Sequence, residues 1–424
     1  MKRLLWSVLA LACLGGGVLL AAFWYLESKG ISPRRLAAYI DQRQQGHNGP
    51  VTALGNAMQA VLHLAEHDAP LAPDFSTWTV GTAAAPPFAG APTRTVASTE
   101  ALRAAMAQAV PGDIIVLAPG RYRIEGGSLA ASRPGTAQAA ITVRGGKDSV
   151  LEANVTEAIA VSAPYWRFEG LNLRGVCPHN GDCEHGLHIV GGAHHTSIVG
   201  NVLSDFNAHI KINGNAAGFP DYGLIEGNRL DNSAVRATES AVTPIDLVAA
   251  SGWVIRANLI RDFIKAGGDK ISYGAYAKGA GAGTLFERNV VWCEDRLQGQ
   301  AGYRVGLSFG GGGSGAQYCR DRKCIVEQEG GIMRANVVAS CTDDGVYLNN
   351  AARSVVANNW VIGTNGVSVR YAGSSADFQN NVIEGRVRSR EGALLREQGT
   401  VEGSTVRDSQ GTVQWALAPP RKVP

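Results

Sequence analysis

The amino-acid sequence predicts an all-β protein whose main domain is a right-handed parallel β-helix. Glycine accounts for 53 of the 424 residues, without a three-residue period, which indicates many turns and excludes collagen. An asparagine followed by two mostly apolar residues recurs along the chain. Each of these asparagines follows a segment with alternating apolar positions, the pattern of a strand with one buried face.

The recurring asparagine gives the length of one coil. Its copies are separated by 27, 30, 31, 47, 23 and 22 residues, and they are Asn201, Asn228, Asn258, Asn289, Asn336, Asn359 and Asn381. A shortest interval near 22 fits a coil of about three short strands and their turns, with longer loops inserted at one corner. We expect the asparagines to stack at one turn, in the left-handed αL conformation, and to pair their side-chain amides. A β-propeller repeats at about 40 residues, with aromatic signatures that are absent here.

The first thirty residues predict a membrane anchor. Lys2 and Arg3 precede an apolar run over 4–26, about the 20 residues with which a helix crosses a bilayer. The cationic end favours a cytoplasmic N-terminus. We therefore expect a single-pass inner-membrane protein with its remaining domains in the periplasm. A cleaved signal peptide is the alternative.

Composition divides the chain into five segments. They are the anchor (1–30), a membrane-proximal helical segment (31–68), a spacer rich in proline and alanine (69–93), the β-helix domain (94–385) and a C-terminal cap or disordered tail (386–424). Ser32 and Pro33 are expected to begin a short helix, and a second helix is expected over 51–67. The β-helix domain is expected to open with a capping helix from Ser98 and the strand Ile114–Leu117.

The six cysteines beyond the anchor predict disulfide bonds, because the anchor places them in an oxidising compartment. Cys177/Cys183 and Cys319/Cys324 would each close a short loop, and Cys293/Cys341 would join neighbouring coils. Six cysteines allow fifteen pairings, so the sequence leaves the connectivity open. A zinc site is the weaker alternative, because neither short spacing is that of a zinc knuckle.

Overall charge argues against nucleic acid as a partner. The net charge is +3, and only 18% of the residues are charged, which provides no broad basic stripe. A hydrophobic content of 45% also excludes a mainly disordered chain.

Alternation within the strands separates residues that face the core from residues that face outward. The pairs expected to face inward are Leu187/Ile189, Ile210/Ile212, Ile245/Leu247, Ala275/Ala277, Leu307/Phe309, Val346/Leu348 and Val367/Val369. The first outward row is His188, Lys211, Asp246, Tyr276, Ser308, Tyr347 and Ser368, and the second is Val190, Asn213, Val248, Lys278, Gly310, Asn349 and Arg370. Coils lie about 4.8 Å apart, so the rows form one continuous strip.

The middle of this strip suits an acidic polysaccharide. Lys211, flanked by His209 and Asn213, is expected one coil from Asp246. Lysine and arginine pair with carboxylates, asparagine bonds to hydroxyls, and tyrosine stacks on sugar rings or donates a proton. A simple surface ion pair between Lys211 and Asp246 is the alternative interpretation. The pairs Glu184-His185 and His194-His195 are expected in turns, where solvated histidines are commoner than ligands.

The chain resembles the chondroitinase B and alginate lyase family of polysaccharide lyases. Stretches similar to the family's N-terminal cap and first coils lie at 96–145, above all Ala109–Leu117, and at 166–171. Stretches similar to its catalytic region lie at 345–350, 367–373 and 380–381. In the family, a lysine after an asparagine is followed one coil later by an arginine. Arg370 falls on that arginine, whereas Asn350 occupies the position of the lysine. The resemblance also implies calcium beside that position, with Asp343 and Asp344 as candidate ligands.

These observations predict cleavage of a uronate-containing polysaccharide by β-elimination. The reaction needs a cation on the uronate carboxylate, a base for the α-proton and an acid for the leaving oxygen. The candidate catalytic residues are Lys211 or Lys278 as base, Tyr276 as acid or base, and Arg304 or Arg370 for the carboxylate. The candidate binding residues are His188, His209, Asn213, Asp246, Tyr347 and Asn349. A C5-epimerase would use nearly the same groups, and a non-catalytic glycan-binding or scaffold protein is the alternative from another class.

Overall fold

The computed structural model of the chain describes residues 21, 25–26, 33–44, 46–64, 93–146 and 148–402. The chain forms two compact units, Met1–His67 and Asp68–Pro424. The first unit contains two described helices, α2 (Pro33–Gln44) and α3 (Gly49–Leu64), where two helices were predicted. Most of the predicted anchor and nearly all of the predicted spacer lie outside the described residues. Among the described helices, none combines the length and apolar character that crossing a bilayer requires.

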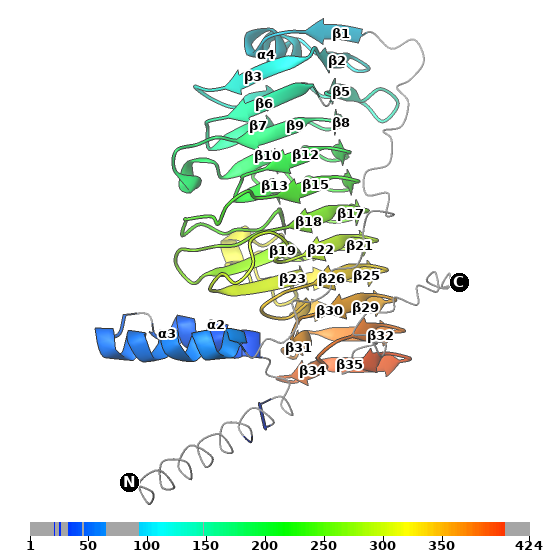
Figure 1. Ribbon diagram of the computed structural model, residues 1–424. Coiled ribbons are helices and arrows are strands. Elements are labelled where there is room, and N and C mark those ends of the chain that lie inside the picture. Colours follow the sequence, from blue (N-terminus) through cyan, green and yellow to red (C-terminus); the bar gives the residue numbers. More distant parts are fainter. Residues whose placement is uncertain are drawn as a thin grey trace, which may run out of the picture. The chain divides into compact units, whose positions relative to one another are not determined.

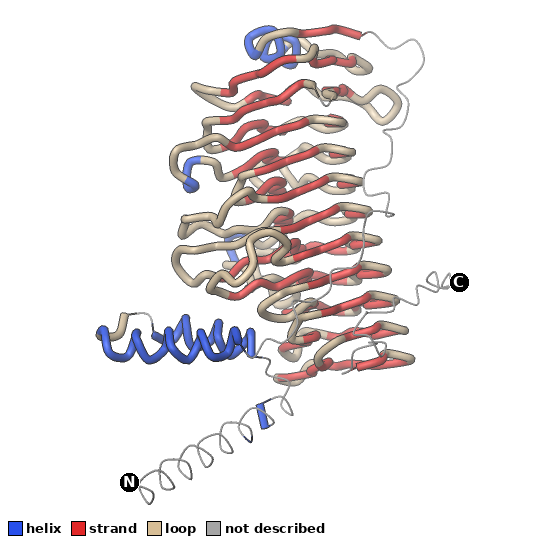
Figure 2. Tube along the Cα trace, viewed as in Figure 1, coloured by secondary structure: helices blue, strands red, loops and turns tan. Residues whose placement is uncertain are grey.

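The second unit is built from three long sheets in which every strand pair is parallel. From β2 on, the strands of the three long sheets, named A, B and C, follow one another in turn along the chain, so each coil adds one strand to each sheet. Figure 1 shows the coils stacked one on another, and Figure 2 shows how loops join the strands at the corners. This is the architecture of a parallel β-helix, as predicted.

The strand bounds follow the coil order in each sheet. Sheet A contains β1 (Thr93–Val96), β2 (Ile114–Leu117), β5 (Ile141–Arg144), β8 (Trp166–Glu169), β11 (Ser197–Val199), β14 (Leu224–Glu226), β17 (Val254–Arg256), β21 (Leu285–Glu287), β25 (Ile332–Arg334), β29 (Ser354–Ala357), β32 (Ser375–Gln379) and β35 (Leu394–Gln398). Sheet B contains β3 (Gly120–Ile124), β6 (Ser149–Ala153), β9 (Asn172–Gly175), β12 (Val202–Ser204), β15 (Arg229–Asp231), β18 (Leu259–Arg261), β22 (Val290–Trp292), β26 (Val337–Ala339), β30 (Trp360–Ile362), β33 (Val382–Ile383) and β36 (Val401–Glu402). Sheet C contains β4 (Leu129–Ala131), β7 (Glu157–Val161), β10 (His185–Val190), β13 (Ala208–Asn213), β16 (Ile245–Val248), β19 (Ile271–Lys278), β23 (Tyr303–Phe309), β27 (Val346–Asn349), β31 (Gly366–Arg370) and β34 (Arg386–Arg390). A small fourth sheet contains β20 (Gly281–Ala282), β24 (Gln328–Glu329) and β28 (Ala351–Ala352).

A short helix, α4 (Thr99–Ala107), covers the first coil. Ser98 is its N-cap and accepts a hydrogen bond from the backbone N–H of Ala101 at 3.1 Å, which satisfies one of the free donors at a helix start. Leu102 and Met106 on this helix are buried against the core. The predicted capping helix and the predicted strand Ile114–Leu117 are both confirmed.

The core lies between the three sheets. All fourteen residues of the predicted inward pairs are buried, so the alternation assigned the two faces of sheet C correctly. Other core positions carry large aromatic side chains, of which Trp166 and Trp253 are fully buried. Each has an indole N–H that donates to a backbone carbonyl, that of Arg133 or Pro220, so the polar atom is satisfied inside the core.

The asparagine ladder is confirmed at the corner between sheets A and B. From Asn201 to Asn359, the Nδ2 of each asparagine donates to the Oδ1 of the next, at 2.9–3.0 Å. The predicted backbone conformation was wrong, because positive φ angles occur one residue earlier, for example at Ala257 and Asn358. The preceding residue makes the turn, which leaves the ladder asparagine free to point its amide inward.

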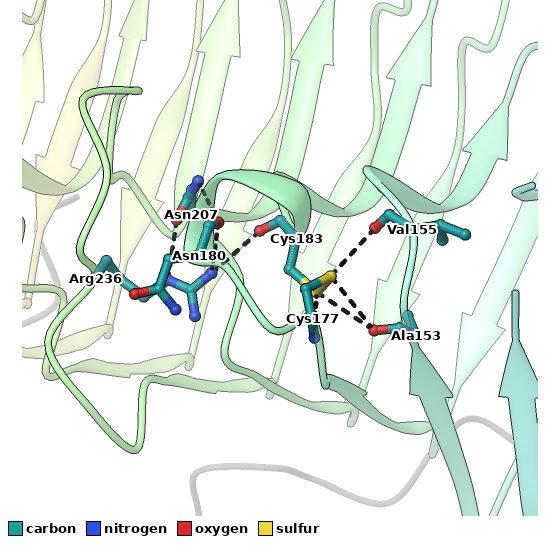
Figure 3. The surroundings of a disulfide bond; sticks show 7 residues. All are labelled: Ala153, Val155, Cys177, Asn180, Cys183, Asn207 and Arg236. Atoms are coloured by element: carbon teal, nitrogen blue, oxygen red, sulfur yellow. Dashed lines mark hydrogen bonds between the residues drawn. A yellow bond between two sulfur atoms is a disulfide. The ribbon is translucent and has the colours of Figure 1, made fainter.

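All three suggested disulfides are present. Cys177–Cys183 and Cys319–Cys324 close loops with sequence separations of 6 and 5, and Cys293–Cys341 joins two coils across a separation of 48. The short helix η2 (Asn180–Asp182) lies inside the first small loop, and η3 (Ala316–Tyr318) directly precedes Cys319 of the second. Figure 3 shows Arg236 fastening the first loop, donating to the carbonyl of Asn180 at 3.1 Å and that of Cys183 at 3.3 Å.

The β-helix extends beyond the predicted boundary at residue 385. Strands β34, β35 and β36 pair in register with β31, β32 and β33 and form a further coil up to Glu402. Arginine and glutamate dominate this coil, so its composition looked like a solvated tail. Residues 403–424 lie outside the described part of the chain.

Candidate functional site

The outer face of sheet C carries the predicted strip in the predicted register. Neighbouring strands align the first row, residue for residue, as His188, Lys211, Asp246, Tyr276, Ser308, Tyr347 and Ser368. In the second row, Asn213, Val248 and Lys278 are aligned, as are Asn349 and Arg370. The roles assigned to these side chains remain predictions, but their placement on one face is a property of the fold.

A buried carboxylate lies at the centre of the strip. Lys211 Nζ is 2.9 Å from Asp246 Oδ1, and the Lys211 and Asp246 side chains are 19% and 5% exposed. Burial favours the neutral acid, yet Lys211, Lys278 and a hydrogen bond from Tyr276 outweigh it and lower the pKa of Asp246. The aspartate is therefore a fixed negative charge between two lysines.

Lys278 combines a cation with a partly apolar environment. Its Nζ donates to the carbonyl of Gly313 at 3.1 Å and lies 4.6 Å from the ring centroid of Tyr276. Burial lowers the pKa of Lys278, and the charge of Lys211 lowers it further, against the opposing effects of Asp246 and Glu327. A lysine with a lowered pKa supplies more neutral amine at a given pH, as a general base requires.

Two loops cover part of the strip, the segment 310–327 and the segment 214–223 between β13 and β14. The segment 310–327 follows β23, and a Cβ placed on Gly311 would lie 3.2 Å from the ring of Tyr276. Arg320 in this segment pairs with Asp221 through contacts of 2.7 and 2.8 Å, and its guanidinium lies 4.3 Å from the ring of Phe219. The glycine-rich loop therefore crosses the strip.

Tyr276 is buried under this cover, which corrects its predicted role as a substrate acid or base. The residue is 4% exposed and packs with Val248 and Ala249, with Phe219 and Tyr273 beside it. Burial and the neighbouring Asp246 raise its pKa well above the ordinary value of tyrosine. The phenol stays protonated and supports Asp246 from within the strip.

His209 does not belong to the exposed strip. It is fully buried, and its Nε2 lies 3.0 Å from the carbonyl oxygen of Asp231. Burial lowers its pKa to about 4, although Asp231 acts in the opposite direction. Asp231 at the end of β15 and the ring of Phe206 contact the buried His209, so the predicted contact with substrate is corrected to a structural role.

Arg304 is likewise a structural residue. Its side chain is fully buried, forms an ion pair with Glu294 and donates to the carbonyl of Ala301 at 2.9 Å. The loop before β23 supplies these partners, so the guanidinium is occupied within the fold. Its predicted pairing with a substrate carboxylate is therefore withdrawn.

Arg370 and its neighbours form the far end of the strip. Arg370 Nη2 lies 2.7 Å from Glu391 Oε1, and its Nη1 lies 3.5 Å from the hydroxyl of Tyr347. Tyr347 and Arg370 are both partly exposed. Asn349 is buried, and its Nδ2 donates to the carbonyl of Gly311 at 3.0 Å. Asn349 therefore holds the covering loop, whereas Tyr347 and Arg370 remain accessible.

At the other end of the strip, the structure adds two residues that the sequence interpretation missed. Glu157 on β7 is in register with His185, the first residue of β10, and lies beside His188. His185 had been expected in a turn, but it begins a strand. Continuing the register one coil toward the N-terminus places Ala160, not Glu157, opposite His188, so strand alternation alone does not predict Glu157 on the strip.

The calcium site implied by the family resemblance does not fit the residues present. Asp344 is buried, and its Oδ1 accepts a hydrogen bond from Arg388 Nη1 at 3.3 Å. Its charge is therefore already balanced by a cation. In the described part of the chain, neither Asp343 nor Asp344 belongs to a cluster of three potential metal-ligating side chains.

Comparison with known proteins gives similarity in structure but not in sequence. No family model and no curated protein matches this chain. Among solved structures, alginate lyase from Paenibacillus sp. str. FPU-7 is 17% identical, with 73% of this chain and 95% of that chain covered and a TM-score of 0.46. Pectate lyase Pel9A is 15% identical, with 74% and 79% covered and a TM-score of 0.44. The lacto-N-biosidase of Eubacterium ramulus is 10% identical, with 83% and 71% covered and a TM-score of 0.48. Polysaccharide lyases are thus among the similar structures, but scores this low do not assign a reaction.

Proposed function

We propose that this protein binds a uronate-containing polysaccharide along the outer face of sheet C and cleaves it by β-elimination, with Lys278 as the base. One observation carries the proposal: Lys211 and Lys278 flank the buried Asp246 on one strand face, and burial lowers the pKa of Lys278. The two lysines can then differ in protonation state. One supplies a cation while the other supplies a neutral amine.

Each step of the elimination has a group to perform it. Lys211 reaches the uronate carboxylate as an ammonium ion and makes the C5 proton more acidic. The neutral amine of Lys278 takes that proton. The electron pair of the broken C5–H bond forms the C4–C5 double bond, and the C4–O4 bond breaks with its electrons going to O4. The leaving oxygen receives a proton from the ammonium group of Lys278 or from water. The products are a new chain end and an unsaturated uronate.

Arg370 belongs to a different sugar subsite in this scheme. Three strand spacings, or about 14 Å, separate its row position from that of Lys278, since β23 and β27 lie between β19 and β31. At this separation, Lys278 and Arg370 do not contact the same uronate. Tyr347 and Arg370 are therefore proposed to bind a neighbouring part of the polymer, where stacking and charge pairing suffice.

A non-catalytic glycan-binding protein is the second candidate. Lys211 already pairs with Asp246 at 2.9 Å, so its charge is balanced within the protein. In addition, Asn350 occupies the position at which the family that the chain resembles has its lysine. An epimerase would also use Lys278 as base but would return the proton to C5 without breaking C4–O4. The two enzymes thus differ in product.

The test uses the disulfide-intact chain with alginate, chondroitin, pectate and bacterial exopolysaccharides. Absorbance of the unsaturated uronate should rise with one polymer for the wild type. Lys278→Arg should reduce the rate at least about 100-fold, because arginine retains the charge but stays protonated. Lys323→Ala, which removes an exposed lysine, serves as the matched control and should retain full activity.

Two results would contradict this assignment. Full activity of Lys278→Arg would remove Lys278 from the mechanism. Binding of a polymer without any absorbance change would favour the glycan-binding protein, unless proton exchange at C5 is observed, which would indicate the epimerase.

The proposed cellular location is the periplasm, with the N-terminal segment in the inner membrane. The apolar run over 4–26 supports this location, as do the three disulfides, which persist mainly in oxidising compartments. Membrane fractionation of cells that express the chain should place it with the inner membrane, and externally added protease should digest the β-helix only after the outer membrane is opened.

A further inference from the structure

A cluster of metal-ligating side chains lies at the N-terminal end of the strip, outside the proposed lysine site. It consists of Glu157 on β7 and of His185 and His188 on β10. One ligand atom from each residue lies within 4.8 Å of the others, and all three residues are partly buried. We propose that this cluster binds one divalent transition-metal ion of the zinc type, through two imidazole nitrogens and one carboxylate oxygen.

The surroundings of His188 fix which nitrogen is available. Its Nε2 lies 2.7 Å from Asn213 Oδ1. The Nδ2 of Asn213 donates to the carbonyl of Gly214 at 3.1 Å, so the amide oxygen must be the atom that faces the histidine. Nε2 therefore carries a proton, and Nδ1 points at Glu157 Oε1, 2.7 Å away. A neutral His188 would present a lone pair to a carboxylate, and a cation between the two relieves that repulsion.

His185 supplies the second nitrogen, which faces Glu157 but makes no hydrogen bond to a described residue. Its Nδ1 is buried and has no hydrogen bond in the described part of the chain. Glu157 Oε1 lies 3.6 Å away, which is too far for a hydrogen bond but close to the separation of two ligands on one metal ion. The rings of His185 and His188 are 4.7 Å apart, tilted by 55°. The nitrogen of His185 thus faces the same small volume as that of His188.

The donor set selects the type of ion. Two imidazoles and one carboxylate suit zinc and similar transition metals, whereas calcium and magnesium prefer oxygen ligands only. Three protein ligands leave a fourth position open to water or to a ligand. Asn213 plays the part of an outer partner, because metal-binding histidines usually donate their second ring N–H to an oxygen acceptor.

The competing explanation involves no metal. A doubly protonated His188 could donate from both nitrogens, to Glu157 and to Asn213, and would form a simple ion pair with the glutamate. That state leaves His185 Nδ1 without a hydrogen bond among the described residues, 3.6 Å from Glu157 Oε1, whereas a metal ion uses all three groups.

The test measures metal binding directly and needs no substrate, so its outcome is independent of the elimination. The untagged, disulfide-intact chain is treated with a chelator, dialysed and titrated with Zn²⁺ by calorimetry. Co²⁺ is then added as a spectroscopic probe, because its visible absorption reports four- or five-coordinate nitrogen ligation. We expect one saturable site per chain, with binding at least about 100-fold weaker in His185→Ala and in Glu157→Gln.

His194→Ala is the matched control. His194 and His195 form another close pair, with Nδ1 atoms 2.8 Å apart, and would account for adventitious binding. The control should bind Zn²⁺ like the wild type. Glu157→Gln keeps the size of the side chain, and an unchanged circular dichroism spectrum verifies its fold. Absence of a saturable site in the wild type, or unchanged affinity in both cluster variants, overturns the proposal.

Discussion

At the scale of single residues, burial decides which ionisable groups on the strip are chemically useful. Lys278 is half-buried beside a fixed aspartate, and burial lowers its pKa. Tyr276 is buried in the same cluster, and the same effect raises its pKa. Desolvation disfavours the charged form of both groups, so it turns the lysine into a better base and the tyrosine into a permanently protonated phenol.

The pH dependence of elimination should therefore follow Lys278. Since the reaction needs the neutral amine, the turnover rate should rise with pH through the lowered pKa of Lys278 and level off before the ordinary lysine value of about 10.4. Initial rates at saturating polymer concentration measure this profile. A rate that keeps rising beyond that value, or that does not depend on pH, would argue against a base with a lowered pKa.

His209 should make the fold sensitive to acid. Its pKa is about 4 in the folded protein, against about 6.5 when unfolded. The unfolded chain therefore takes up a proton that the folded chain does not, as pH falls from 6.5 to 4. This proton uptake does not affect the free energy of unfolding above pH 6.5, and it lowers that free energy by about 3 kcal/mol near pH 4.

His209→Gln isolates this effect. Glutamine does not titrate and can donate to the carbonyl of Asp231, as the Nε2 of His209 does. Urea unfolding of both proteins at pH 7 and pH 4.5 should show a smaller loss of stability in the variant. Asp205, Asp231 and Arg236 surround the histidine and are common to both proteins. Equal losses would assign the acid sensitivity to other groups.

At the scale of elements, the asparagine ladder links each turn to the next. Asn258 Oδ1 accepts two hydrogen bonds from Asn228, and its Nδ2 donates to the carbonyl of Ile225 and to Asn289. Because the site is fully buried, Asn258→Ala leaves several polar groups without partners. Each such group costs about 1–3 kcal/mol, so we expect a loss of about 3 kcal/mol or more.

Denaturant unfolding measures the effect of Asn258→Ala. The exposed Asn154 provides the control, and Asn154→Ala should change stability by less than about 0.5 kcal/mol. A loss that small at Asn258 would mean that water replaces the missing amide.

The disulfides should differ in their contribution. Cys293–Cys341 closes a loop with a separation of 48 and Cys319–Cys324 one of only 5. Loss of loop entropy in the unfolded chain predicts about 4 kcal/mol for the long loop and about 2 kcal/mol for the short one. Paired cysteine-to-alanine variants, unfolded in denaturant, test this order. A larger loss for the short loop would show that local packing outweighs chain entropy.

Sequence patterns predicted the sheets better than the loops that cover them. Alternating apolar residues assigned both faces of sheet C, and the recurring asparagine predicted the ladder, because both signals repeat with each coil. The burial of Tyr276 and Arg304 involves loops that occur once each, and His209 is buried by contacts that the alternation does not encode. A residue's outward parity states which side of a strand it occupies, not whether a later segment folds over it. The loss of those three residues from the candidate site follows from this difference.

At the scale of the whole molecule, a solenoid gains stability coil by coil, since each coil contacts only its neighbours. The core runs without interruption from Val96 on β1 to the last coils. Residues 93–402 contain the capping helix α4, every described strand and the three described disulfides. All described coils of the β-helix lie within this range, and we expect residues 93–402 to fold without the N-terminal helices.

Truncation distinguishes the observed end of the β-helix from the predicted one. A chain of residues 93–385 lacks β34, β35 and β36, whose Val387 and Leu395 pack against the core, and it uncovers the strand edges of β31, β32 and β33. We expect it to be less stable than residues 93–402 by about 2 kcal/mol or more, through lost apolar burial. Thermal and urea unfolding of the two fragments beside the full chain measure this. If the last coil protects the coil before it, its removal must lower stability. Equal stability of the two fragments would therefore show that the last coil does not contribute to the stability of the β-helix.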